Sequence, residues 1–189
     1  PMLGGYLAGQ GAPLLGGLAA IGLGAEVSRF EAALEALRDI SLARLELAAD
    51  FAQIFLLDAK AGAPPYASMY EGDDPQFCGT AEAQMRDFLA ASGLSIDTRF
   101  REPADHLAVY LALMRHLLEQ HQDARDIAAT AVDQAAFLHD ALLGWLPKFV
   151  RRCQQARPQF DFYPALGALL LAFVRQDACF LRDVAGHDA

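Results

Sequence analysis

Apolar side chains recur at spacings of three and four along most of this chain, which is the spacing of one face of an α-helix. Such stripes run through residues 28–58, 80–92, 103–120, 126–146 and 162–184. No run of useful length alternates apolar and polar residues as a half-buried strand does. The pattern therefore predicts an all-α fold, a helical bundle of about seven helices.

Glycine, proline and capping residues predict where these helices begin and end. Residues 1–24 hold eight of the fifteen glycines, so we expect a weak or broken helix there. Ser28 is a good N-cap for the first strong helix, which runs to about Asp58 either as one helix or as two helices divided near 39–41. Loops are expected at 60–76 and 94–102, followed by a helix that takes Pro103 into its first turn.

The charge and composition narrow the classes of partner. The net charge is −9, and no block of Lys or Arg is long enough to follow a phosphate backbone, so a nucleic-acid partner is not expected. An acidic surface attracts a basic partner, or it serves only solubility, and the sequence leaves both open. Hydrophobic residues make up 54% of the chain, which is enough for a large core.

The apolar segments and the cysteines of the sequence indicate the cellular compartment of the protein. The apolar stretch at 13–25 is shorter than the ~20 residues of a spanning helix and lacks the basic flank of a secretory signal. We therefore expect no membrane span, no export signal and a cytoplasmic location. Three widely spaced cysteines give neither a disulfide framework nor a zinc pattern, and we expect Cys153 and Cys179 to be buried.

The segment Glu102-Pro103-Ala104-Asp105-His106 places two carboxylates at the start of a predicted helix. One interpretation is a helix cap with a first-turn proline, in which Asp105 holds His106. The other is an acidic cluster that accepts an arginine-bearing ligand, because carboxylates bind guanidinium groups through paired hydrogen bonds. The residues alone leave both interpretations open.

An enzymatic interpretation uses Asp105 and His106 as an orienting acid and a base. No partner nucleophile accompanies them, since the sequence has no GxSxG motif and no cysteine in basic surroundings. His116 and His121 are five residues apart, about 140° round a helix, so they do not converge on a metal ion. We predict no catalytic residue and no metal site. A helical hydrolase and a helical adaptor without a groove stay as alternatives from other classes.

The loop Pro65-Tyr66-Ala67-Ser68-Met69-Tyr70 is the second feature of interest. Tyr66, Ser68 and Tyr70 could pack over the core and hydrogen-bond to it, or they could line a groove for a peptide. The sequence does not decide between these two roles.

Taken together, these features resemble the TorD/DmsD family of redox-enzyme maturation chaperones. The resemblance extends from about residue 45 to 177, its most specific part is EPADH, and within the family it favours the branch that serves trimethylamine N-oxide reductase. The stretches that carry it are Leu45 to Phe51, Pro65 to Tyr70, Glu102 to Tyr110, and Trp145 to Phe149 followed by Phe162-Tyr163.

The resemblance implies a helical protein in two halves. These are residues 1–93, a hinge connector at 94–103, and residues 104–189, with no counterpart of the family's usual first amphipathic helix in the glycine-rich start. It implies a non-enzymatic chaperone that binds a twin-arginine signal peptide and the apo form of a molybdoenzyme before export. The residues that match the family's binding motifs are Glu102, Asp105, His106, Tyr66, Ser68 and Tyr70.

Other implications of the resemblance concern cofactors and assembly. No cofactor is expected, although weak guanine-nucleotide binding is attributed to the family. A homodimer formed by helix exchange is plausible, because a long connector permits swapping. A sister chaperone for dimethyl sulfoxide or nitrate reductase is the nearest alternative.

Overall fold

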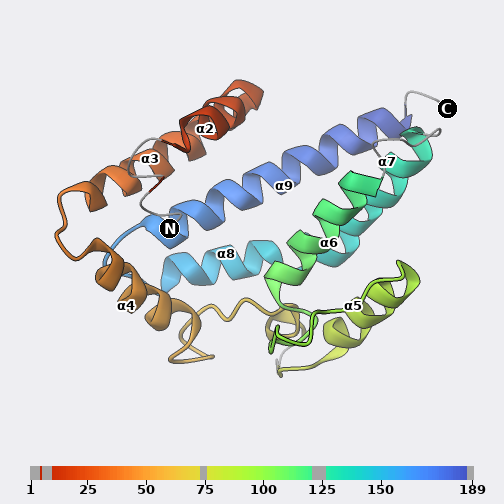
Figure 1. The fold of residues 1–189 in the computed structure, drawn as a ribbon, viewed down its shortest axis with the longest axis horizontal. Coiled ribbons are helices and arrows are strands. Elements are labelled where there is room, and N and C mark those ends of the chain that lie inside the picture. Colours follow the sequence, from red (N-terminus) through yellow and green to blue (C-terminus); the bar gives the residue numbers. More distant parts are fainter. Residues whose placement is uncertain (1–4, 6–9, 73–75, 121–126, 187–189) are drawn as a thin grey trace. The chain divides into compact units, whose positions relative to one another are not determined.

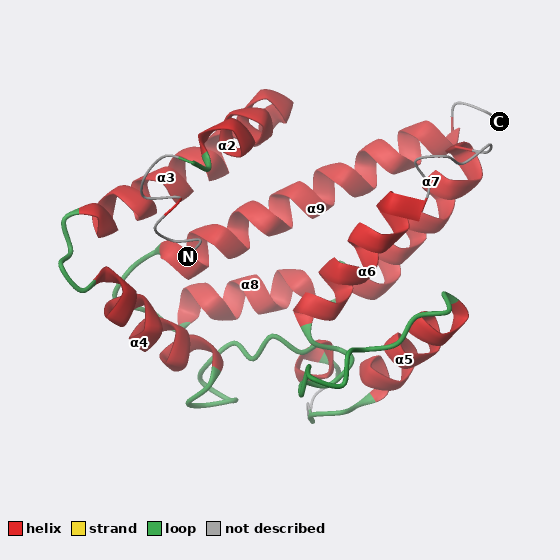
Figure 2. Cartoon of the chain, viewed as in Figure 1, coloured by secondary structure: helices red, strands yellow, loops and turns green. Residues whose placement is uncertain are grey.

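The computed structural model describes Gly5 and residues 10–72, 76–120 and 127–186, and these residues form helices joined by loops (Figure 2). Within these ranges the structure has no strand, and a single antiparallel bridge joins Tyr66 to His106. The predicted all-α class is confirmed.

The helices follow one another along the chain as drawn in Figure 1. When α2, η1 and α3 are counted as one kinked helix, and α7 and η3 as one helix, the described ranges contain seven helices apart from the short η2, as predicted. They are α2 (Ala12–Leu18), the π-helix η1 (Ala19–Leu23), α3 (Gly24–Arg38), α4 (Ala43–Phe55), the 3₁₀-helix η2 (Ala67–Tyr70), α5 (Thr80–Ala91), α6 (Leu107–Gln120), α7 (Ile127–Ala136), the π-helix η3 (Phe137–Leu142), α8 (Leu146–Gln155) and α9 (Phe162–Gly186).

The chain forms two compact units, each built from segments that are distant in sequence. Unit 1 comprises Pro1–Pro64 and Val150–Arg175, and unit 2 comprises Pro65–Phe149 and Gln176–Ala189. The unit boundaries therefore fall inside α8 and α9. The predicted division of the chain at 94–103 follows the sequence rather than these contacts and stays a prediction.

In unit 1 the glycine-rich start is helical but kinked. Gly22 has a φ of 100°, which interrupts the helix between α2 and α3 and matches the broken helix expected here. The predicted start at Ser28 is wrong, because α3 continues from η1 and already includes Ser28. The break that divides the next stretch is confirmed, since α3 ends at Arg38 and α4 begins at Ala43.

The core of unit 1 forms where α2 and α3 pack against the start of α9. The ring of Phe30 lies 5.4 Å from that of Phe162, measured between centroids. Because these side chains lie far apart in the sequence, the core of unit 1 is complete only when α9 is in place. The buried cluster comprises Leu15, Leu23, Val27, Phe30, Ala33, Leu34, Ala165 and Leu169.

A buried carboxylate fixes the turn before α9. Asp50 in α4 is only 2% exposed, and its two oxygens accept the backbone N–H groups of Gln159 and Phe160 at 2.8 and 2.9 Å. A carboxylate that is removed from water needs such donors. Asp50 thus joins α4 to the entry of α9 by charge-assisted hydrogen bonds.

In unit 2 the helix ends follow recognisable local rules, with one exception. Gly93 follows α5 and has a φ of 67°. Its N–H donates to Ala90 O at 3.0 Å, and the N–H of Leu94 donates to Leu89 O at 2.8 Å. Glycine commonly ends a helix in this way. The exception is Pro103, which we expected in the first turn of α6. That helix begins only at Leu107, because the backbone just before it pairs with another loop.

Helix α9 is long and apolar, with a mean hydropathy of 1.4 in its most apolar window. Among the helices that the structure describes, it alone is long and apolar enough to cross a membrane, and 39% of that window is buried. Its residues Ala165 and Leu169 belong to the unit 1 core, and the core helix of a soluble protein can be equally long and apolar. The expected absence of a membrane span stays a prediction.

Two of the cysteine expectations can be compared with the structure. Cys153 is buried as expected, and burial raises the pKa of its thiol to about 12. Cys179 is exposed, so the expectation that it is buried is wrong. The apolar neighbours of Cys179 in sequence do not cover it, since it lies on an outward face of α9.

Asp50→Ala is expected to lower the free energy of unfolding by about 3 kcal/mol, because two backbone N–H groups lose a charged acceptor. Urea unfolding measures this loss. The matched control is Asp58→Ala, since Asp58 Oδ1 also accepts two backbone N–H groups, those of Lys60 and Ala61, but is fully exposed. In Asp58→Ala, water replaces the carboxylate as the acceptor, so the decrease in the free energy of unfolding is expected to be clearly smaller. Equal losses would contradict the role given to Asp50.

Candidate functional site

The predicted site residues meet where two loops of unit 2 pair with each other. The N–H of Leu107 donates to Pro65 O at 2.8 Å, and the N–H of Ala67 donates to Asp105 O at 3.0 Å. Between these bonds Tyr66 and His106 form the antiparallel bridge. We call this pairing of residues 65–67 with 105–107 the loop junction. It explains why α6 starts at Leu107, because the preceding backbone is committed to the other loop.

Asp105 lies at the centre of the loop junction and is fully buried, with 0% exposure. Its Oδ2 accepts the backbone N–H of Ser68 at 2.9 Å, so the carboxylate binds the first turn of η2 rather than the start of α6. Asp105 Oδ1 and Ser68 Oγ are also buried, and neither has a hydrogen-bond partner among the residues described. In this structure, then, Asp105 and Ser68 do not face solvent.

Tyr66 and Glu102 form the exposed edge of the loop junction. The Tyr66 hydroxyl donates to Glu102 Oε2 at 2.6 Å. Burial, followed by the hydrogen bond and the charge of Glu102, raises the pKa of Tyr66 above its ordinary value. The hydroxyl therefore stays protonated and donates to a carboxylate that remains open to solvent.

His106 packs against two aromatic rings rather than against Asp105. Its ring meets those of Tyr66 and Phe100 edge-on, at centroid distances of 5.1 and 5.6 Å. Its Nδ1 accepts the backbone N–H of Ala108 at 3.0 Å. Burial lowers the pKa of His106, and the charges of Glu102 and Asp105 oppose this effect. In the described part of the chain, Asp105 does not orient His106 as an acid–base pair requires.

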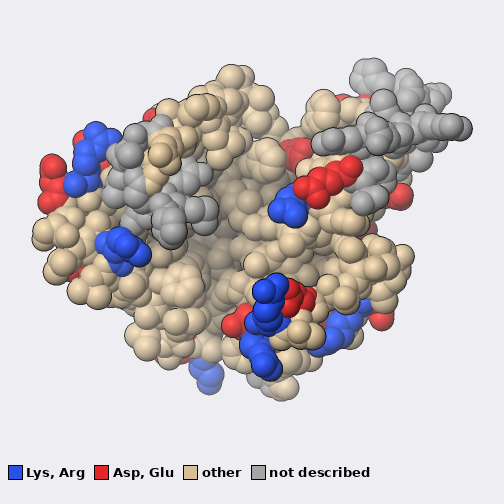
Figure 3. Space-filling model, viewed as in Figure 1, with Lys and Arg blue, Asp and Glu red and all other residues tan. Residues whose placement is uncertain are grey.

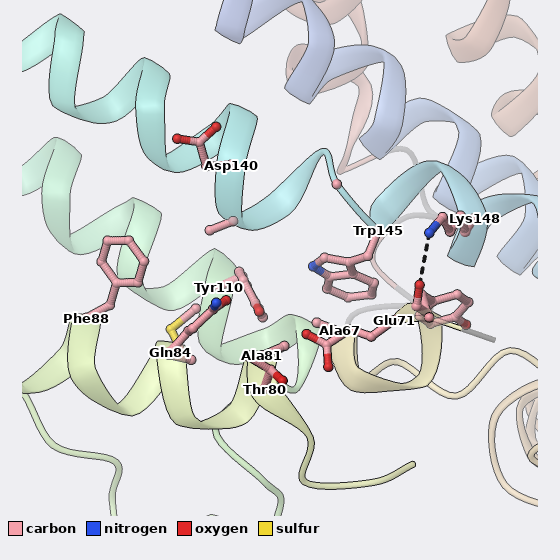
Figure 4. Close-up of a pocket in the computed structure, with 15 residues that line it drawn as sticks. Ala67, Glu71, Thr80, Ala81, Gln84, Phe88, Tyr110, Asp140, Trp145 and Lys148 are labelled. Carbon is pink, nitrogen blue, oxygen red and sulfur yellow. Dashed lines mark hydrogen bonds between the residues drawn. The ribbon is translucent and has the colours of Figure 1, made fainter. Parts of the chain in front are cut away.

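Next to η2 lies an open pocket of about 910 Å³. Figure 4 shows side chains from η2, α5, α6 and the segment before α8 turned toward it. The ring of Tyr70 stacks on that of Trp145 at 5.7 Å with 26° between planes, and Tyr110 lies 5.5 Å from Trp145. These rings form an aromatic wall. The lining residues are Ala67, Tyr70, Glu71, Gly72, Thr80, Ala81, Gln84, Met85, Phe88, Tyr110, Asp140, Ala141, Gly144, Trp145 and Lys148.

Charged groups stand at the rim of the pocket. Glu71 and Asp140 approach it from different elements, with Tyr110 and Trp145 between them in Figure 4. The Nζ of Lys148 donates to Tyr70 O at 3.0 Å, so this cation is tied to η2. A Cβ on Gly79 would lie 2.8 Å from Glu71 Oε2, so the absence of a side chain there leaves room for the carboxylate. The pocket thus combines an apolar aromatic wall with acidic edges.

A second cavity of about 430 Å³ lies between the 94–100 connector and α6. Its lining is mainly apolar, with His116 and Asp97 among the polar exceptions. Within the described ranges no group of three or more His, Cys, Asp or Glu side chains could hold a metal ion. His121, the other histidine considered for a metal, lies outside those ranges.

The structure brings most of the predicted site residues together but gives them different positions. Tyr66 and His106 are partly exposed in the loop junction, and Glu102 is exposed beside it. Asp105 and Ser68 are buried, and Tyr70 lines the neighbouring pocket. Sequence reasoning missed the pocket residues Glu71, Phe88, Tyr110, Asp140 and Trp145. Tyr110 and Trp145 lie in the stretches that carry the family resemblance, which is the signal that could have found them.

The described part of the chain is all-α and has an open, aromatic-lined pocket, and the comparisons with known proteins show its family. The chain matches the family model described as nitrate reductase delta subunit over residues 20–151. That region includes the whole loop junction and every residue that lines the larger pocket.

Curated relatives give the family more closely. A protein from Psychrobacter sp. (strain PRwf-1) is 47% identical over 142 residues, which are 75% of this chain and 64% of that protein. A protein from Vibrio parahaemolyticus is 38% identical over 79% of this chain and 70% of its own length. A protein from Photobacterium profundum is 40% identical over 82% of this chain and 73% of its own length. All three are named Chaperone protein TorD. The chain belongs to the TorD family.

These findings agree with the expected family and with the expectation of a non-enzymatic protein, since the relatives are named as chaperones. The aligned region spans less than two thirds of the Psychrobacter relative. What the whole relatives bind and do is therefore carried to this chain only as a proposal.

The lowered pKa of His106 predicts a pH-dependent stability. Since the unfolded chain binds the proton more tightly than the folded one, protonation favours unfolding. The loss of stability begins as the pH falls below the ordinary value of 6.5 and is complete below the folded-state pKa. Urea unfolding at pH 7.5 and 5.5 measures it. His106→Asn keeps an acceptor for the Ala108 N–H but cannot titrate, so we expect a smaller loss on acidification. An equal loss in both proteins contradicts the prediction.

Proposed function

We propose that this protein is a cytoplasmic chaperone that binds the twin-arginine signal peptide, and the apo form, of a molybdoenzyme of the trimethylamine N-oxide reductase type. It assists cofactor insertion before export and performs no turnover of its own. The observation that carries the proposal is the open pocket of about 910 Å³, whose aromatic wall is flanked by carboxylates. A twin-arginine signal has the complementary chemistry, two guanidinium groups ahead of an apolar segment.

The apolar part of the peptide supplies much of the binding free energy but not all of it. Burying about four large side chains yields roughly 6–12 kcal/mol. Association and ordering of the segment cost about 4–15 kcal/mol. Contacts with the arginine pair therefore decide whether binding is measurable, and we expect a micromolar affinity, near −8 kcal/mol.

Accessible carboxylates are the natural partners of the arginine pair. Glu71 and Asp140 stand at the pocket rim, and Glu102 stands at the exposed edge of the loop junction. In the proposal Tyr66 and His106 flank the bound segment and Tyr70 contributes to the pocket wall. Asp105 and Ser68 are buried, so they support the site without direct contact. The net charge of −9 favours the encounter with a basic peptide.

The surface of the protein is compatible with such a local site. On the face drawn in Figure 3, several basic side chains stand next to acidic ones in small groups. Two such ion pairs join Arg99 to Asp97 at 2.6 Å and Arg115 to Glu119 at 3.3 Å. Paired charges attract a charged peptide weakly. Asp140 at the pocket rim also contacts His139, with 2.7 Å between Oδ1 and Nδ1, so Glu71 is the rim carboxylate that gains importance.

Several parts of the proposal go beyond the pocket. No resident cofactor is required, because the role is to bind and release a client. Weak guanine-nucleotide binding, a homodimer formed by helix exchange, and the absence of a nucleic-acid partner all stay predictions. A client of the dimethyl sulfoxide or nitrate reductase type would use the same pocket chemistry, and copurification from the source cell followed by mass spectrometry distinguishes these clients.

The binding proposal predicts that a twin-arginine peptide alters the fluorescence of Trp145, the chain's single tryptophan, which lines the pocket. Calorimetric titration should give a micromolar Kd that weakens with salt. Glu71→Gln is expected to weaken binding about fivefold, a typical effect for a partly exposed ion pair.

The matched control is Glu26→Gln, which alters a carboxylate that is half-buried like that of Glu71 but lies in the first turn of α3, outside the pocket. It should bind as the unaltered protein does. A peptide with two glutamines in place of the arginines should bind more weakly. Equal binding of the two peptides, or no binding of either, would refute the proposal.

A further inference from the structure

We propose that Asp105 is a positioning residue, which holds η2 in place and thereby sets the aromatic wall of the pocket without touching the peptide. The inference rests on the proposed function, because it concerns the same pocket. It differs from the simplest interpretation of EPADH, in which both carboxylates meet the arginines directly.

The first step of the argument is the burial of Asp105. Its exposure is 0%, whereas Glu102 of the same motif is exposed. A guanidinium group from outside cannot reach a side chain that is fully covered. Asp105 also uses two of its own atoms on η2, since its Oδ2 accepts the Ser68 N–H at 2.9 Å and its backbone oxygen accepts the Ala67 N–H at 3.0 Å.

The second step is the weakness of η2 by itself. It is a single turn of four residues, closed by bonds from Met69 N to Tyr66 O at 3.1 Å and from Glu71 N to Ser68 O at 3.4 Å. Short 3₁₀ turns have poor hydrogen-bond geometry, and one turn does not repay the entropy of fixing its backbone. The two bonds from Asp105 reach the first two residues of this turn, so they supply an anchor that η2 lacks.

The third step connects η2 to the pocket. Tyr70 is its last residue, and its ring stacks on Trp145. The backbone oxygen of Tyr70 accepts a hydrogen bond from Lys148, and Glu71 at the rim follows directly. A shift of η2 therefore moves the aromatic wall and an acidic edge together, although Asp105 itself lines neither.

The fourth step is that this role needs an acceptor rather than a full charge. An asparagine at position 105 presents a side-chain oxygen to the Ser68 N–H, whereas an alanine presents nothing. Positioning therefore predicts that Asp105→Asn preserves most of the binding and Asp105→Ala does not. Direct contact with arginine predicts that both substitutions weaken binding alike and reduce its dependence on salt.

The first measurement uses the free protein and the emission of Trp145. Asp105→Ala should shift or change the intensity of this emission, because Tyr70 no longer stacks on the indole as before. Asp105→Asn should resemble the unaltered protein. Asp58→Ala is the matched control, since Asp58 also accepts backbone N–H groups but lies in unit 1, outside the pocket. Unchanged emission in Asp105→Ala overturns the positioning role.

The second measurement is titration with the twin-arginine peptide at two salt concentrations. We expect binding within about threefold of the unaltered protein for Asp105→Asn and Asp58→Ala, and about tenfold weaker binding for Asp105→Ala, the loss of one hydrogen bond to a charged group. The salt dependence should be unchanged in all three. Equal weakening by the asparagine and alanine variants, with reduced salt dependence, overturns the proposal.

The two measurements separate this inference from the proposed function. If the unaltered protein binds no twin-arginine peptide, the proposed function fails, and the emission of Asp105→Ala alone decides the positioning role. If Asp105→Ala does not fold, Asp105→Asn decides it. Near-normal affinity with unchanged salt dependence then supports positioning, and strong weakening with reduced salt dependence overturns it.

Discussion

Backbone N–H and C=O groups in the loops of a helical protein have no helix or sheet to supply their hydrogen bonds. In unit 2 the loop junction supplies these bonds. Residues 65–67 and 105–107 satisfy one another's N–H and C=O groups, and the side chain of Asp105 adds a charged acceptor at their centre. The start of α6, the placement of η2 and the orientation of Tyr70 all depend on this pairing. The pocket wall is thus a consequence of how two loops share their hydrogen bonds.

Unit 1 meets the same constraint in a similar way. Asp50 is buried and accepts two backbone N–H groups from the turn before α9, much as Asp105 accepts one from η2. Each carboxylate lies in one of the stretches that resemble the TorD family. A buried carboxylate that binds only backbone is costly to remove from water, and hydrogen bonds to the charged form offset that cost. Both motifs therefore have a structural reason for an acidic residue before any ligand is considered.

The sequence predicted the helices better than it predicted their starts and their exposed faces. Periodicity located α9 to within two residues at its end, because that helix is long and strongly patterned. Ser28 and Pro103 are not helix starts, contrary to the prediction. Ser28 lies inside α3, which continues from η1, and the backbone that follows Pro103 pairs with a loop distant in sequence. Phe88 and Phe180 follow the apolar stripes, yet they are 44% and 62% exposed, because neighbouring elements and not the period decide what is covered.

For the site, the motifs identified the right neighbourhood but not the roles. Tyr66, Glu102 and His106 do meet, as their shared family pattern suggests. The burial of Asp105 could not be foreseen, because its partner Ser68 lies 37 residues earlier in the chain and no local pattern connects the two. Likewise Asp140 reaches the pocket from a segment that carries no motif.

The interleaving of the two units has a consequence for the order in which the protein can fold. The core of unit 1 joins Leu15 and Phe30 to Ala165 and Leu169, so its contacts are among the most non-local in the chain. During synthesis α2 and α3 leave the ribosome long before α9 is made, and until then their apolar faces remain exposed to solvent. Closing so long a loop is slow. The apolar faces of these first helices therefore favour aggregation of the newly made chain until α9 has been synthesised.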